Sequence, residues 1–191
     1  MNRRKAIFSI FLLGGAGAFS YSGLTWYQHA KTPDFTFLNN NEALIADLAE
    51  VIIPATSTPG AKDVMAQKTI ISLIKQCADR KTQNNFINGL RDIMKYADRK
   101  FGKPFTSLSP AEQKMIVAHF QEEGRNFSGT SGKIKNKLLG KSFFEILRYY
   151  TTVAFCTSQS GANNALAYSL IPGKYISCIN LSPGQRAWAT K

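Results

Sequence analysis

The residues that could carry chemistry are few and scattered along the chain. There are two histidines, His29 and His119. His119 lies beside Phe120 in an amphipathic helical pattern, which favours a core or boundary histidine over a catalytic one. No His-Glu-x-x-His, Gly-x-Ser-x-Gly or Gly-x-Gly-x-x-Gly pattern occurs. The sequence therefore offers no independent case for an enzyme, and no catalytic, cofactor-binding or metal-binding residue is predicted.

The three cysteines, Cys77, Cys156 and Cys178, do not have the spacing of a metal site. Without a Cys-x-x-Cys or a Cys/His cluster, zinc and iron–sulfur centres are excluded by this route. In an oxidising compartment Cys156 and Cys178 could form a disulfide. Cys77 occupies an apolar helical position and is expected to be buried. Three buried, reduced cysteines are the alternative.

The N-terminus has the three parts of a bacterial export signal. Arg3 and Arg4 lie in a positive first segment, residues 6–19 are apolar and uncharged, and residues 16–18 are small. We therefore predict an export signal over residues 1–18, and the paired arginines point to the twin-Arg route for folded cargo. The alternative is an uncleaved anchor, because no charge follows until Lys31 and about 20 apolar residues span a bilayer. The expected location is the periplasm or the periplasmic face of the inner membrane.

The composition is that of one basic globular domain. The chain has 191 residues, 44% of them hydrophobic, and a formal net charge of +12. That length is enough for a single domain with a real core. A basic balance suits anionic lipid, an acidic protein or nucleic acid. Because most of the lysines are scattered and the chain is expected to be exported, no nucleic-acid partner is predicted.

The apolar residues recur at helical spacing through most of the chain. We predict an all-α fold, an irregular bundle of five to seven helices with an extended C-terminal arm. Residues 19–40 are expected to be a linker, 41–173 the helical domain and 174–191 the arm. Helices are expected from about 44 to a stop at Pro54, over 62–79, from 86 to a cap at Gly102, over 109–124 with a Ser109/Glu112 capping box, over 134–157 with a break at Gly140, and over 161–169.

Aromatic residues concentrate in the last third of the sequence and interleave with Arg148, Lys174 and Arg186. Aromatic and arginine side chains are typical anchors of protein interfaces. Tyr175 and Trp188 in the arm are therefore candidate partner contacts. For other aromatics, Phe155 among them, packing in the core is the simpler interpretation.

Four segments resemble one known family. Residues 48–62, Leu-Ala-Glu-Val-Ile-Ile-Pro-Ala-Thr-Ser-Thr-Pro-Gly-Ala-Lys, are similar to the hallmark block of the gluconate 2-dehydrogenase subunit 3 family. Residues 155–159 resemble its aromatic-Phe-Thr-Ser-Glu segment, with Gln159 in place of the usual acid. Residues 172–175 resemble its Pro-Gly-x-Tyr turn, and residues 184–188 its Gly-x-x-x-Trp ending.

This resemblance implies a non-catalytic small subunit that escorts and stabilises the large subunit of a flavin-dependent oxidoreductase for export. FAD is expected in that partner and not in this chain, and a cytochrome c subunit is a further possible partner. Pro54, Pro59 and Gly60 are candidate contacts, because a helix ended by proline and followed by a rigid turn presents a fixed shape. A purely structural corner is the alternative for this loop. Cys178 is the candidate for an intersubunit disulfide.

A different class of function competes with the escort. A membrane-anchored basic periplasmic protein would bind anionic lipid or cell-wall polymer through its positive charge. Such a protein would be a stable domain without a partner. The escort would expose an apolar patch and behave poorly when expressed alone.

Overall fold

The computed structural model describes residues 31–125 and 140–167, together with residues 171, 173, 174, 178, 180 and 183–188. The export signal with Arg3 and Arg4 lies outside the described residues, as does Tyr175. Those expectations therefore stay predictions. Residues 134–139 of the helix expected over 134–157 also lie outside them.

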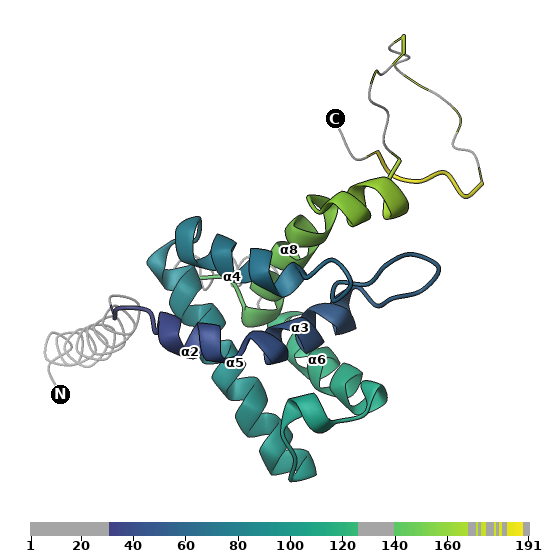
Figure 1. The fold of residues 1–191 in the computed structure, drawn as a ribbon. Coiled ribbons are helices and arrows are strands. Elements are labelled where there is room, and N and C mark those ends of the chain that lie inside the picture. The colour runs from purple at the N-terminus through teal and green to yellow at the C-terminus, as the bar shows by residue number, and fades with distance from the viewer. Residues whose placement is uncertain are drawn as a thin grey trace, which may run out of the picture.

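The described chain is helical (Figure 1). A single isolated bridge, between Ala167 and Trp188, is the only β pairing among the described residues. The all-α prediction is therefore confirmed. In chain order the elements are α2 (Phe35–Asn40), α3 (Glu42–Ile52), α4 (Ala66–Gln76), α5 (Arg80–Phe101), the 3₁₀ turn η1 (Phe105–Ser107), α6 (Pro110–Arg125), α8 (Phe143–Cys156) and the π-helical turn η2 (Gly161–Ala165).

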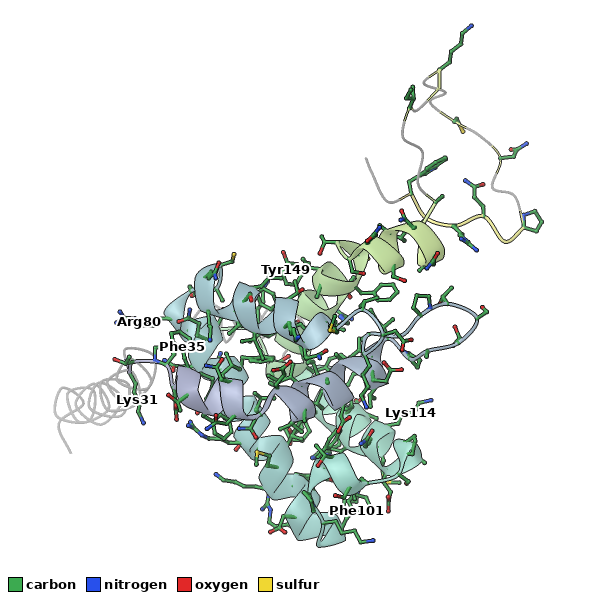
Figure 2. All side chains as sticks on the ribbon, viewed as in Figure 1. Lys31, Phe35, Arg80, Phe101, Lys114 and Tyr149 are labelled. Atoms are coloured by element: carbon green, nitrogen blue, oxygen red, sulfur yellow. The ribbon has the colours of Figure 1, made fainter. Side chains whose placement is uncertain are left out.

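Helix α8 is the centre of the bundle, because it contacts α3, α4, α5 and α6. It buries Ile146, Leu147, Thr151, Ala154 and Phe155. Burial of each large apolar side chain contributes roughly 1.5–3 kcal/mol. Tyr149 of the same helix is exposed (Figure 2). The facing core residues are Leu44, Ile45 and Leu48 of α3, Ile70 and Ile74 of α4, Phe86, Leu90 and Ile93 of α5, and Ile116 of α6.

Local signals in the sequence set the helix ends. Gly102 ends α5 in the left-handed conformation (φ 64°), as predicted. Ser109 begins α6, and its backbone N–H donates to the Glu112 carboxylate at 2.8 Å, which confirms the predicted capping box. A second capping box, formed by Ser142 and Glu145, begins α8 and was not predicted.

Several boundaries differ from the prediction. The linker expected over 19–40 is wrong at its end, because Phe35–Asn40 forms α2, capped by the Asp34 side chain and packed through buried Leu38. The helix expected over 62–79 is shorter, since α4 starts at Ala66 and ends at Gln76. In the last expected helix, 161–169, the described residues hold only the five-residue turn η2.

Cys77 is exposed, so the prediction that it is buried is wrong. It continues the spacing of Ile70 and Ile74, but it is the C-cap of α4, where the backbone leaves the helix. Because α4 ends at Gln76, the helical spacing does not place the Cys77 side chain in the core. Within the described residues, none of the helices has the length and apolar character needed to cross a bilayer.

Candidate partner-binding site

His119 is the histidine that the structure describes, and its surroundings show what it does. His119 is partly exposed and stacks on Tyr96 with a ring-centroid distance of 4.5 Å. Its Nε2 lies 3.6 Å from a Glu123 carboxylate oxygen, on the same helix. No group of three or more His, Cys, Asp or Glu side chains with metal-binding geometry occurs in the described part of the chain. The histidine is therefore a boundary residue, as its sequence context predicts.

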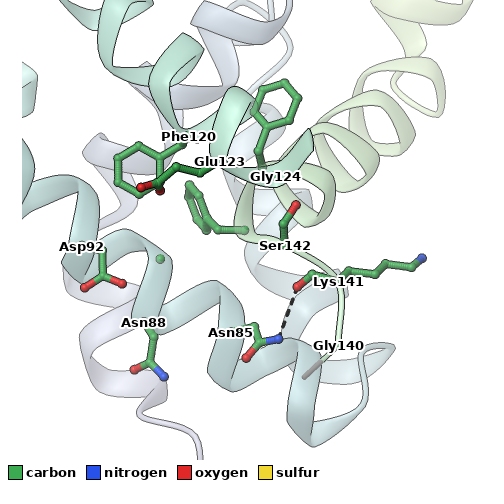
Figure 3. Close-up of a pocket in the computed structure, with 12 residues that line it drawn as sticks. Asn85, Asn88, Asp92, Phe120, Glu123, Gly124, Gly140, Lys141 and Ser142 are labelled. Carbon is green, nitrogen blue, oxygen red and sulfur yellow. Dashed lines mark hydrogen bonds between the residues drawn. The ribbon is translucent and has the colours of Figure 1, made fainter. Parts of the chain in front are cut away.

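A cavity of about 290 Å³ lies between α5, the end of α6 and the start of α8 (Figure 3). The charged residues that line this cavity are Asp92, Glu123 and Lys141. The Ser142 hydroxyl could act as a nucleophile, but it bonds Glu145 in the capping box of α8. A nucleophile needs a base to activate it, and the hydrogen bonds of the Ser142 hydroxyl are those of a helix cap. The cavity carries no recognisable catalytic arrangement.

The loop after α3, residues 54–60, is tied to that helix by several hydrogen bonds, and we call it the docking loop. Figure 1 shows it projecting from the helical body. Pro54 ends the helix as predicted, because proline cannot supply the backbone N–H that another turn needs. The Glu50 side chain, in the last turn of α3, then reaches the loop. Its two oxygens accept from the Ala55 N–H at 2.8 Å and from the Lys62 N–H at 2.9 Å.

Further bonds close the two ends of the docking loop. The Ala61 N–H donates to the Ile53 carbonyl at 2.9 Å, so the chain returns to where it left α3. The Gly60 N–H donates to the Asp63 carboxylate at 2.8 Å. Lys62 forms an ion pair with Asp47 of α3. The loop is therefore tied to α3 at its start and at its end.

Gly60 is required by a close approach and not by its backbone angle. A Cβ atom there would lie 2.5 Å from Glu50 Oε1 and 2.6 Å from the Ala55 nitrogen. Real Cβ atoms do not come so close, so only glycine lets the carboxylate pass under the loop. Glu50 belongs to the block quoted for the resemblance, but its structural role was missed. Its partners lie five and twelve residues downstream, beyond the reach of helical spacing rules.

The predicted contacts divide into two groups. Pro54 is exposed at the start of the docking loop, together with Ala55, Thr56 and Ser57. Pro59 is half-buried and Gly60 is buried. The first group is accessible to a partner, whereas Pro59 and Gly60 shape the loop from within.

Residues 187 and 188 of the C-terminal arm pair with Ala167, two residues after η2 ends. The Ala167 N–H donates to the Ala187 carbonyl at 2.8 Å, and this bond forms the bridge next to Trp188. Trp188 is 58% exposed, so the tryptophan side chain is available at the surface. Cys178 is exposed, Cys156 is partly buried, and all three cysteines are free thiols.

Fold and surface together define a small helical protein whose distinctive features are a tethered projecting loop and an arm with an exposed aromatic residue. The family model for gluconate 2-dehydrogenase subunit 3 matches residues 39–173. The chain belongs to this family, and membership implies an accessory subunit of a dehydrogenase complex. No curated protein sequence and no solved structure is significantly similar to the chain.

Proposed function

We propose that this chain is the non-catalytic small subunit that escorts and stabilises a flavin-dependent, gluconate 2-dehydrogenase-like large subunit for export of the folded complex. The observation that carries the proposal is the family match over residues 39–173. The large subunit binds FAD and performs the oxidation, and a cytochrome c subunit accepts the electrons. The complex works in the periplasm or on the periplasmic face of the inner membrane.

The physical basis of the escort is the order of folding and transport. A flavoprotein has to fold around its cofactor before it leaves the cytoplasm. If it has no export signal, a tightly bound partner can supply one, and the N-terminus of this chain has the features of a twin-Arg address. The tethered docking loop supports the binding half of this role, because a preformed loop loses little conformational freedom on association.

The experiment measures whether a flavoprotein binds this chain and is exported with it. The tagged full-length chain is purified from its native cell, and the captured material is tested for FAD and for sugar or alcohol dehydrogenase activity. In parallel, Arg3→Lys/Arg4→Lys keeps the positive charge but removes the twin arginines. We expect FAD to co-purify with the wild-type chain, and both proteins to stay in the cytoplasm when the arginines are replaced.

Two results would contradict the proposal. One is a flavoprotein that reaches the periplasm in cells lacking this chain. The other is a chain that captures no FAD and instead binds anionic vesicles in a salt-dependent manner, which would support the lipid-binding alternative.

A further inference from the structure

We propose that Glu50 is the positioning residue of a preformed docking loop, residues 54–60, whose uncharged tip enters a concave, uncharged surface of the large dehydrogenase subunit. This inference rests on the proposed function, because it takes the large subunit as the occupant. It goes further by naming the contact and the residue that holds it in shape.

Glu50 is the side chain that ties both ends of the docking loop to a rigid helix. Both oxygens of the Glu50 carboxylate accept backbone N–H groups, from Ala55 and Lys62, and these bracket the loop. Hydrogen bonds to a charged acceptor are stronger than neutral ones. Glu50 itself sits on α3, whose residues 44, 45 and 48 lie in the core. The loop is therefore anchored to a rigid element and not merely to its own neighbours.

The tip of the docking loop is small and uncharged. Residues 54–57 are exposed and consist of Pro, Ala, Thr and Ser, without any charge, although the chain carries a net +12. The Thr56 and Thr58 hydroxyls lie 3.3 Å apart, whereas the Ser57 hydroxyl forms no hydrogen bond to any described residue. A tip of small, uncharged side chains fits a narrow concave surface through shape and hydrogen bonds. It carries no positive charge to attract an anionic lipid headgroup.

Met65, five residues after the docking loop in the sequence, is an exposed apolar side chain at the start of α4. This residue has a positive φ of 49°, an unfavourable conformation for a residue with a side chain, and it is 54% exposed. Strained backbone of this kind is found where the surrounding structure dictates it, often at functional sites. The Met65 carbonyl accepts the Lys68 N–H at 3.1 Å as α4 begins. An exposed, adaptable thioether is a side chain that a partner protein can contact.

The test uses the complete complex and a matched pair of substitutions. Thr56→Arg places a long charged side chain on the tip, and Thr69→Arg makes the same change at an exposed position of α4. We expect Thr56→Arg to weaken association with the large subunit about tenfold or more, which corresponds to a loss of about 1.4 kcal/mol or more. Thr69→Arg should bind as the wild type does.

Glu50 is tested with Glu50→Gln, and Glu42→Gln serves as the control on the same helix. Glutamine presents an NH₂ group to one of the two backbone N–H donors, so one bond is lost. We expect faster hydrogen exchange at the Ala55 and Lys62 amides and weaker association with the large subunit. In the double variant Glu50→Gln/Thr56→Arg, the effect of Glu50→Gln on binding should largely vanish, because a blocked tip gains nothing from being preformed.

The outcomes separate the two proposals. If the wild-type chain captures no flavoprotein, the escort function fails. If the wild type binds and Thr56→Arg binds equally well, or Thr69→Arg weakens association as much, the docking loop is overturned and the escort function stands. Fully additive effects of Glu50→Gln and Thr56→Arg on binding would show that Glu50 acts on general stability and does not position the tip.

Discussion

Gly60→Ala is the most direct test of the tether between Glu50 and the docking loop. The new methyl carbon would lie 2.5 Å from Glu50 Oε1, 2.6 Å from the Ala55 nitrogen and 2.7 Å from Glu50 Oε2. It collides with both oxygens of the carboxylate and with one of the two N–H groups that the carboxylate binds. The side chain and the loop cannot both keep their positions, so the bond from Ala55 to Glu50 should break.

The magnitude follows from two opposing terms. Losing a hydrogen bond to a charged group costs about 1.5–3 kcal/mol, and the lower end applies because Glu50 is only partly buried. Replacing glycine by alanine returns roughly 0.4–1 kcal/mol by restricting the unfolded chain. The expected net loss in the free energy of unfolding is about 1 kcal/mol, which lowers the Tm by roughly 2–4 °C for a chain of this size.

Thermal unfolding alone cannot assign that loss to the loop, so the assay includes hydrogen exchange and a control. Gly102 has a φ of 64°, and a methyl group added there would have no atom within 4 Å. Gly102→Ala therefore carries only a conformational cost of about 1–2 kcal/mol. Both variants should lower the Tm by similar amounts. Only Gly60→Ala should speed exchange at Ala55 and Lys62 and weaken capture of the flavoprotein.

One result would refute the tether. If Gly60→Ala leaves the Ala55 and Lys62 amides as protected as in the wild type, the carboxylate does not hold the loop. An equal loss of protection in Gly102→Ala would likewise show that these amides report global unfolding and not a local tether.

Three further predictions concern the helical body and can be measured on the purified chain. In Gly89→Ala the new methyl group would overlap the Phe143 ring, so α5 and α8 should separate and stability should fall by about 1–3 kcal/mol in chemical denaturation. Ser142→Ala removes the bond to the Glu145 N–H and should cost about 1 kcal/mol in the same assay, with an unchanged circular dichroism spectrum. Burial raises the pKa of Tyr150, with smaller contributions from neighbouring ionisable groups, so the folded state retains this proton more tightly than the unfolded chain. The contribution of this protonated tyrosine to the free energy of unfolding is complete below the unfolded pKa of about 10 and is lost as the pH rises through the pKa of the folded state. Phenylalanine has no proton to lose, so Tyr150→Phe should lose less stability than the wild type between about pH 9 and 11.

The features that sequence predicted well depend on short-range chemistry. Gly102 ends α5 through its own backbone conformation. Ser109 and Glu112 bond each other across three residues at the start of α6. Pro54 ends α3 through its own missing N–H. The Ser142/Glu145 box has the same spacing and could have been found by the same rule. The prediction placed a break at Gly140 in this helix but did not look for a cap at the residues that follow it.

The features that sequence missed depend on contacts that only the fold creates. Cys77 follows the apolar spacing of α4, but the helix ends at the residue before it and Cys77 is exposed. Helix α2 has six residues, too few to show a period, and it is held by Leu38 in the core and by a salt bridge from Asp34 to Arg91 of α5. Glu50 received no role from the sequence, because nothing in the sequence shows that the chain returns to it after twelve residues.

The contrast between a basic chain and an uncharged docking loop leads to a last prediction about how the two subunits meet. Charge acts over about 8–10 Å in physiological salt and mainly sets how often partners collide, whereas short-range contacts set how long they stay together. The net charge of +12 should therefore speed association with an acidic surface of the large subunit, and rising salt should slow it. The ratio of dissociation rates between Thr56→Arg and wild type should hardly change with salt, because the wild-type tip has no charge to screen. Rates measured by surface plasmon resonance at low and high salt decide this. A strong salt dependence of wild-type dissociation would mean that charged contacts hold the complex together and that the docking loop plays a minor part.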